Sequence, residues 1–112
     1  MAIESLEPQR RAATPEGAVC AIVRAETRKG AGAEFAALLS DLAYSVRADE
    51  DGCTSYVVTR MMGSPEHFAV HARFTDWRAF EQHADTSHLK RLMPRINALL
   101  AAPFSMEIFL EV

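Results

Sequence analysis

The strongest constraint on the fold comes from residues 68–92, because the spacing of apolar side chains changes there at a single point. In residues 68–74 (FAVHARF), every second position from Phe68 to Phe74 is apolar, and His71 and Arg73 lie between. This alternation is typical of a half-buried strand. After Thr75 and Asp76 the apolar residues recur every three to four positions, the period of an amphipathic helix. Either residue can cap the N-terminus of that helix. The sequence therefore predicts a strand that turns directly into a helix.

Similar patterns predict the elements on either side of this junction. We expect a break that divides the second helix in two near residues 85–87, and Pro94 should kink or interrupt its second part. The other expected elements are strands over residues 18–26, 53–62 and 104–112 and a helix over 33–48. The order β-α-β-β-α-β is typical of a ferredoxin-like α+β fold, in which helices cover one face of an antiparallel sheet.

The second face of this sheet is also expected to be covered. Tyr56 and Val58 must lie on the opposite side of their strand from Val57, yet all three are largely apolar. Phe109 breaks the alternation of the last strand in the same way. A second copy of the same sheet is the simplest cover. We therefore expect a homodimer with the architecture of a dimeric α/β barrel.

The overall composition indicates an ordinary globular domain. The 112 residues are 49% apolar and 24% charged, with a net charge of −3, which suits one domain and gives no reason to expect nucleic acid or a membrane as partner. The segment 1–17 has no sustained period and is expected to form a loose N-terminal arm before the domain at 18–112. Without a secretory or membrane-spanning pattern, we expect a cytoplasmic protein, with Cys20 and Cys53 as free thiols.

His83 and His88 are the residues best suited to acid–base chemistry, because imidazole titrates near neutral pH. The alternative is that one or both cap a helix or lie at the surface. Their spacing of five residues does not suit two metal ligands on one helix face, and no third ligand is apparent, so no metal is expected. The sequence also lacks a glycine-rich phosphate loop and a G-x-S-x-G motif. We therefore expect no cofactor.

Four other residues are candidates for binding a substrate. Trp77 and Tyr56 can line a cavity or simply pack in the core. His71 and Arg73 share one side of their strand, and the apolar residues of 68–74 occupy the other. The apolar set suits the helices better, which leaves His71 and Arg73 toward a cavity or the interface.

With these residues in place, the chain resembles the antibiotic biosynthesis monooxygenase family over residues 18–112. The shared features are a G-C-x-x-Y strand start and a strand that runs into an aspartate followed by two spaced histidines. In this sequence they are Gly52, Cys53, Tyr56, Asp76, His83 and His88, with Thr86 and Ser87 beside the family's serine position. Two departures concern the end of the strand before Asp76, where Ala72 replaces a glutamate and Phe74 the usual tryptophan.

The resemblance implies cofactor-independent oxygenation, by molecular oxygen, of a phenolic, quinol or polyketide-like aromatic molecule. It implies His83 or His88 as the base, with Tyr56, Trp77 and Arg73 positioning the ring or its oxyanion. Haem degradation, another activity of relatives, is disfavoured. Val23 or one of its neighbours occupies the place of that branch's asparagine, and His83 and Met93 occupy those of its tryptophan and histidine. Two alternatives stay open: a non-catalytic, stress-associated binding protein, and an isomerase of a small carbonyl compound.

Overall fold

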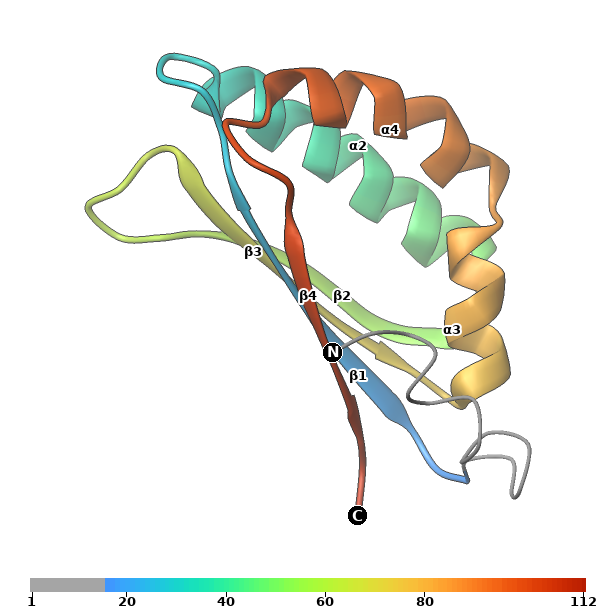
Figure 1. The fold of residues 1–112 in the computed structure, drawn as a ribbon. Coiled ribbons are helices and arrows are strands. Elements are labelled where there is room, and N and C mark those ends of the chain that lie inside the picture. The colour runs from blue at the N-terminus through green and yellow to red at the C-terminus, as the bar shows by residue number, and fades with distance from the viewer. Residues whose placement is uncertain (1–15) are drawn as a thin grey trace.

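The computed structural model describes residues 16–112, so most of the expected N-terminal arm lies outside the described residues. Figure 1 shows the elements in their chain order. They are β1 (Val19–Glu26), α2 (Gly32–Asp49), β2 (Cys53–Arg60), β3 (His67–Phe74), α3 (Trp77–Ala84), α4 (Ser87–Leu99) and β4 (Ser105–Leu110). Within this part of the chain, no helix has both the length and the apolar character needed to cross a bilayer.

The four strands form one antiparallel sheet in the order β2-β3-β1-β4. Helices α2 and α4 lie side by side over one face of this sheet, and the short α3 stands at its end (Figure 1). The split of the second helix into α3 and α4 falls where the sequence predicted it. The architecture is the predicted ferredoxin-like α+β fold.

The core lies between the sheet and the two long helices. Every second residue of β3 is buried there, and α2 contributes an apolar stripe at helical spacing. The stripe and the strand residues form one cluster that includes Phe35, Leu38, Leu42, Val46, Phe68, Val70, Ala72 and Phe74. The apolar set of β3 therefore faces the helices, as the sequence indicated, and His71 and Arg73 point to the other face.

The strand-to-helix junction also forms as predicted. Asp76 is the N-cap of α3, and its carboxylate accepts a hydrogen bond of 2.8 Å from the backbone N–H of Ala79. The expected interruption at Pro94 does not occur, because α4 continues through this residue to Leu99. Pro94 lies on the exposed side of the helix, and so does Lys90, whose carbonyl loses its helical partner. Water can hydrate that carbonyl, so the helix tolerates the proline.

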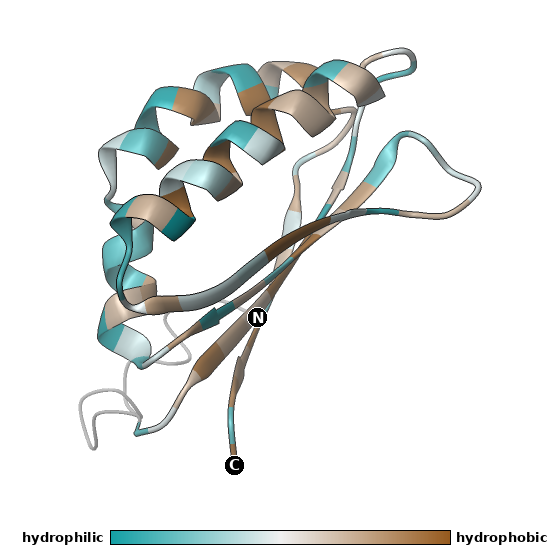
Figure 2. Ribbon diagram, turned by 180° about the vertical axis from the view of Figure 1, so that it is seen from behind, coloured by the Kyte–Doolittle hydropathy of each residue, from teal (hydrophilic) through white to brown (hydrophobic). Residues whose placement is uncertain are grey.

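The face of the sheet opposite the helices carries both apolar and charged side chains. Val57 and Phe109 are 46% and 50% exposed, and Ile22 lies between their strands. Ion pairs of Arg24 with Glu107 and of Arg73 with Glu111 flank them. In Figure 2 apolar residues colour long parts of the strands, whereas the helices alternate between apolar and polar residues. We call this surface the open face.

Candidate functional site

An apolar cavity of about 260 Å³ lies between the sheet and the helices. Tyr56 and His83 are the polar side chains among the described residues that line it. The remaining wall is apolar and comes from the strands, from all three helices and from the segment before β4. It includes Val23, Phe35, Leu39, Phe68, Val70, Phe80, Leu89, Met93, Ile96, Leu100, Phe104 and Met106. Such a cavity suits a small, uncharged and largely apolar ligand.

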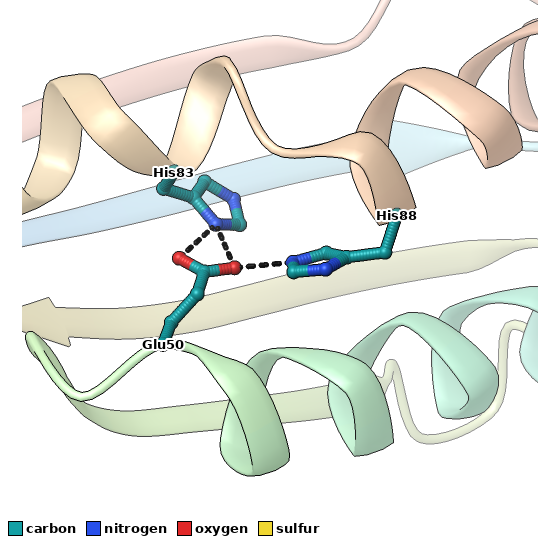
Figure 3. Close-up of side chains that lie close together, drawn as sticks. All are labelled: Glu50, His83 and His88. Atoms are coloured by element: carbon teal, nitrogen blue, oxygen red, sulfur yellow. Dashed lines mark hydrogen bonds and ion pairs between the residues drawn. The ribbon is translucent and has the colours of Figure 1, made fainter.

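Behind His83, three polar side chains from three elements meet (Figure 3). Nδ1 of His83 lies 2.9 and 3.0 Å from the two carboxylate oxygens of Glu50. Nε2 of His88 lies 2.5 Å from Oε2 of the same carboxylate. We call Glu50, His83 and His88 the Glu–His–His cluster.

The local sequence explains why the two histidines converge. His83 lies in the last turn of α3 and His88 in the first turn of α4. Between them the chain breaks, and the hydroxyl of Thr86 donates a hydrogen bond of 2.9 Å to the carbonyl of His83. The change of helix direction allows side chains five residues apart to reach one point. Glu50 reaches that point from the C-cap of α2.

The burial of the cluster determines how its protons are arranged. The Glu50 side chain is only 9% exposed, and those of His83 and His88 are 14% and 7% exposed. A buried carboxylate must be hydrogen-bonded to be stable, so both imidazoles donate an N–H to it. In a neutral imidazole, a proton on Nδ1 leaves the lone pair on Nε2. The hydrogen bonds to Glu50 therefore select the tautomer of His83 whose Nε2 can accept a hydrogen bond.

Sequence reasoning missed Glu50. The acidic segment of residues 49–51 reads as the end of a helix, and the histidines lie more than thirty positions away in the sequence. One signal was available: a negative charge at a helix C-terminus is unfavourable to the helix dipole unless it has a partner. In the folded protein, the partners of this glutamate are the two histidines.

Tyr56 lies next to the cluster on the cavity side. Its ring centroid is 5.6 Å from that of His83, and Phe74 contacts the same imidazole at 5.3 Å. Burial raises the pKa of the Tyr56 phenol above its usual value, and the nearby Cys53 and Glu50 add to the effect. Tyr56 therefore remains a neutral hydrogen-bond donor over the physiological range.

The other three predicted site residues lie elsewhere. Trp77 begins α3 and packs on Phe80 at 5.4 Å, outside the cavity lining. His71 and Arg73 are on the open face, so the sheet separates them from the cavity. Nε2 of His71 lies 3.3 Å from the Thr59 hydroxyl. Arg73 binds both carboxylate oxygens of Glu111 and donates to Thr54.

Fold and site together define a class: small α+β proteins whose single sheet and helices enclose one apolar, ligand-sized cavity. The sequence model of the antibiotic biosynthesis monooxygenase family matches residues 18–95. The chain belongs to this family. No curated protein sequence matches it significantly.

Solved structures of similar proteins share the fold. A candidate antibiotic biosynthesis monooxygenase from Caulobacter crescentus is 24% identical with a TM-score of 0.82, over 87% of this chain and 92% of that one. A conserved protein from Methanosarcina mazei is 21% identical with a TM-score of 0.79, over 86% and 94%. A variant of SnoaB, a cofactor-independent oxygenase from Streptomyces nogalater, is 20% identical with a TM-score of 0.74, over 85% and 93%.

Proposed function

We propose that the protein is a cofactor-independent monooxygenase of a small phenolic or quinol-type aromatic molecule, which it binds in the apolar cavity. The observation that carries this proposal is the imidazole of His83, which lines the cavity on one side and contacts the Glu50 carboxylate on the other. Membership of the monooxygenase family supports the reaction type. The similarity to SnoaB, itself a cofactor-independent oxygenase, is consistent with it.

In the proposed reaction, Nε2 of His83 removes a proton from the hydroxyl group of the substrate. The resulting anion is electron-rich and transfers an electron to molecular oxygen, so the aromatic ring supplies every electron that the reaction needs. The ring carbon loses its hydrogen and gains one oxygen atom as a carbonyl. The other oxygen atom leaves as water, with the proton of that carbon and the proton that His83 removed from the hydroxyl group. The apolar walls exclude bulk water from the reactive anion, and the neutral phenol of Tyr56 donates a hydrogen bond to its oxygen.

Glu50 and His88 are positioning residues in this proposal. The carboxylate of Glu50 holds the Nδ1 proton of His83 and stabilises the imidazolium that forms when Nε2 accepts a proton. His88 holds the second oxygen of that carboxylate. Loss of His88 would therefore weaken catalysis through Glu50 rather than by direct contact with the substrate.

The proposed functional unit is a homodimer in which the open faces of two chains meet. The exposed apolar side chains of Val57 and Phe109 favour this contact. The location of His71 and Arg73 on the same face suits a role at the interface better than one against a ligand in the cavity.

Oxygen consumption with a panel of hydroquinones and anthrones tests the proposal. We expect turnover to fall by about 10²–10⁴-fold in His83→Ala and by a smaller factor in His88→Ala, with both variants still folded. His67→Ala is the matched control, since this histidine lies at the far end of the sheet and contacts Ser64. Unchanged oxygen consumption in His83→Ala would contradict the assignment of the base.

The same experiment separates the two other functions. An isomerase would continue to turn over its carbonyl substrate without oxygen and would consume none. A binding protein would retain the ligand without converting it, a result that the alanine at position 72 favours, since the family usually has a glutamate there.

A further inference from the structure

We propose that the Glu–His–His cluster binds one divalent first-row transition-metal ion, and that this ion and the base function of His83 exclude each other. Metal binding depends only on the three side chains. The inhibition rests, in addition, on the proposed function.

The donor atoms of the three side chains are close enough to bind one ion together. One ligand atom each from Glu50, His83 and His88 lies within 4.8 Å of the other two. The distances from the histidine nitrogens to the Glu50 carboxylate oxygens are 2.5–3.0 Å. Neighbouring ligands on a metal with bonds of about 2.1 Å are roughly 3 Å apart. An ion that replaces the two N–H protons therefore needs only a small outward movement of the side chains.

The chemistry of the donors decides which ion fits. Two imidazole nitrogens and one carboxylate oxygen suit Zn²⁺, Co²⁺, Ni²⁺, Cu²⁺ or Fe²⁺, whereas Mg²⁺ and Ca²⁺ prefer a shell of oxygens. The carboxylate also balances half of the charge of the ion within a largely buried site.

A second cleft provides a path to the cluster for a cation. This cleft has a volume of about 320 Å³, is lined in part by Glu50 and shares no lining residue with the apolar cavity. Asp49 and Asp51 are exposed acidic residues that line it, so their charges raise the local concentration of cations. The cleft is lined by Asp49, Glu50, Asp51, Gly52, Cys53, Ala79, Gln82 and Thr86.

The position of the ion explains why it would inhibit the base. Among the three ligands only His83 lines the apolar cavity, and Glu50 lines the acidic cleft. The ion would therefore lie behind the imidazole and would not touch a ligand in the cavity. When Nδ1 of a neutral imidazole binds the metal, its one proton moves to Nε2. Nε2 then donates a hydrogen bond and can no longer accept the proton of the substrate.

The test measures binding directly. Protein stripped with a chelator is titrated with Zn²⁺ in competition with a chromophoric chelator, and with Co²⁺ by its visible absorption. We expect one ion per chain and a rise in the melting temperature of the wild-type protein with Zn²⁺. Glu50→Gln and His88→Ala should each weaken Zn²⁺ binding by about 100-fold or more, whereas His67→Ala should bind as the wild type does. Circular dichroism establishes that each variant is folded.

Two results would overturn the inference. One is the absence of stoichiometric Zn²⁺ binding and of a melting shift in the wild-type protein, which requires no variant. The other is Zn²⁺ binding by both Glu50→Gln and His88→Ala that is as tight as in the wild-type protein. A protein that binds Zn²⁺ but never consumes oxygen would contradict the proposed function and leave the metal site intact. Full turnover with Zn²⁺ bound would contradict the mutual exclusion alone.

Discussion

At the scale of single residues, Glu50 links the chemistry of the site to the stability of the fold. Leaving a buried carboxylate without its partners costs several kcal/mol, and here both partners are the histidines of the cluster. The sequence indicated the two histidines and the break between the two helices that carry them. It indicated Glu50 only through an unfavourable charge at a helix C-terminus, because the hydrogen bonds that define its role connect positions distant in the chain.

Tyr56 gives a prediction about alkaline pH. Its phenol has a raised pKa in the folded protein, so the folded state binds that proton more tightly than the unfolded chain. The resulting stability is fully present below about pH 10, the unfolded pKa, and is lost as the pH rises through the folded value. In an ultraviolet titration, one of the two tyrosines should ionise only as the protein unfolds. Tyr56→Phe should abolish this late step; a late step that persists in the variant would contradict the assignment.

Gly52 gives a prediction about close packing. A Cβ atom at this position would lie 2.5 Å from Cβ of Ala79 in α3. Gly52→Ala should therefore lower the free energy of unfolding by about 1–3 kcal/mol and displace the helix that carries His83. Urea denaturation measures the change.

The double variant Gly52→Ala, Ala79→Gly is the control for this contact. Ala79→Gly alone should cost about 1 kcal/mol in a helix, yet the double variant should lose less than the sum of the two single variants. Strict additivity would show that the two residues do not collide.

At the scale of elements, the sequence predicted most of what the structure contains. The change from period two to a helical period located the junction of β3 and α3, and Asp76 capped the helix as its residue type suggested. These features depend on neighbours in the sequence. The effect of Pro94 could not be predicted in this way. A helix tolerates an internal proline when water can hydrate the carbonyl that loses its hydrogen bond. The packing of α4 on the rest of the protein determines whether that carbonyl is exposed.

Pro94 therefore gives the prediction at this scale. Pro94→Ala restores the helical hydrogen bond to the carbonyl of Lys90 and removes the clash with the proline ring. We expect the free energy of unfolding to rise by about 1–3 kcal/mol, measured by thermal or urea denaturation. Arg95→Ala, at the neighbouring exposed position, should change it by less than about 0.5 kcal/mol. A loss of stability in Pro94→Ala would show that the proline contributes more through packing than it costs the helix.

At the scale of the whole molecule, the open face is the surface of the sheet that exposes apolar side chains to solvent. The sequence predicted apolar residues on both sides of the strands, and Val57 and Phe109 are indeed exposed on the side away from the helices. What the sequence could not predict is the arrangement of ion pairs beside them. Arg24 of β1 pairs with Glu107 of β4, and Arg73 of β3 pairs with Glu111 just after β4, so each pair joins positions far apart in the chain.

The proposed dimer makes a testable prediction here. Phe109→Glu places a charge in the middle of the apolar part of the open face, and burying it against a second copy would be costly. We expect the mass in solution, measured by light scattering at micromolar concentration, to fall from two chains to one. Tyr44→Glu, on the exposed surface of α2, is the control and should leave the mass unchanged. A wild-type protein with the mass of a single chain would contradict the proposed dimer.

The shallow attachment of α3 has a kinetic consequence. None of its residues is fully buried, and the contacts that hold it include the Asp76 cap, the contact of Phe80 with Phe74 and the bonds of His83 to Glu50. A short element with no fully buried residue opens locally at a lower free energy than the domain as a whole. Because Phe80, His83 and Ala84 form part of the cavity wall, each such opening exposes the cavity. The exchange of a bound molecule should then follow the opening rate of one short helix, and the same rate should appear in the hydrogen exchange of its amides.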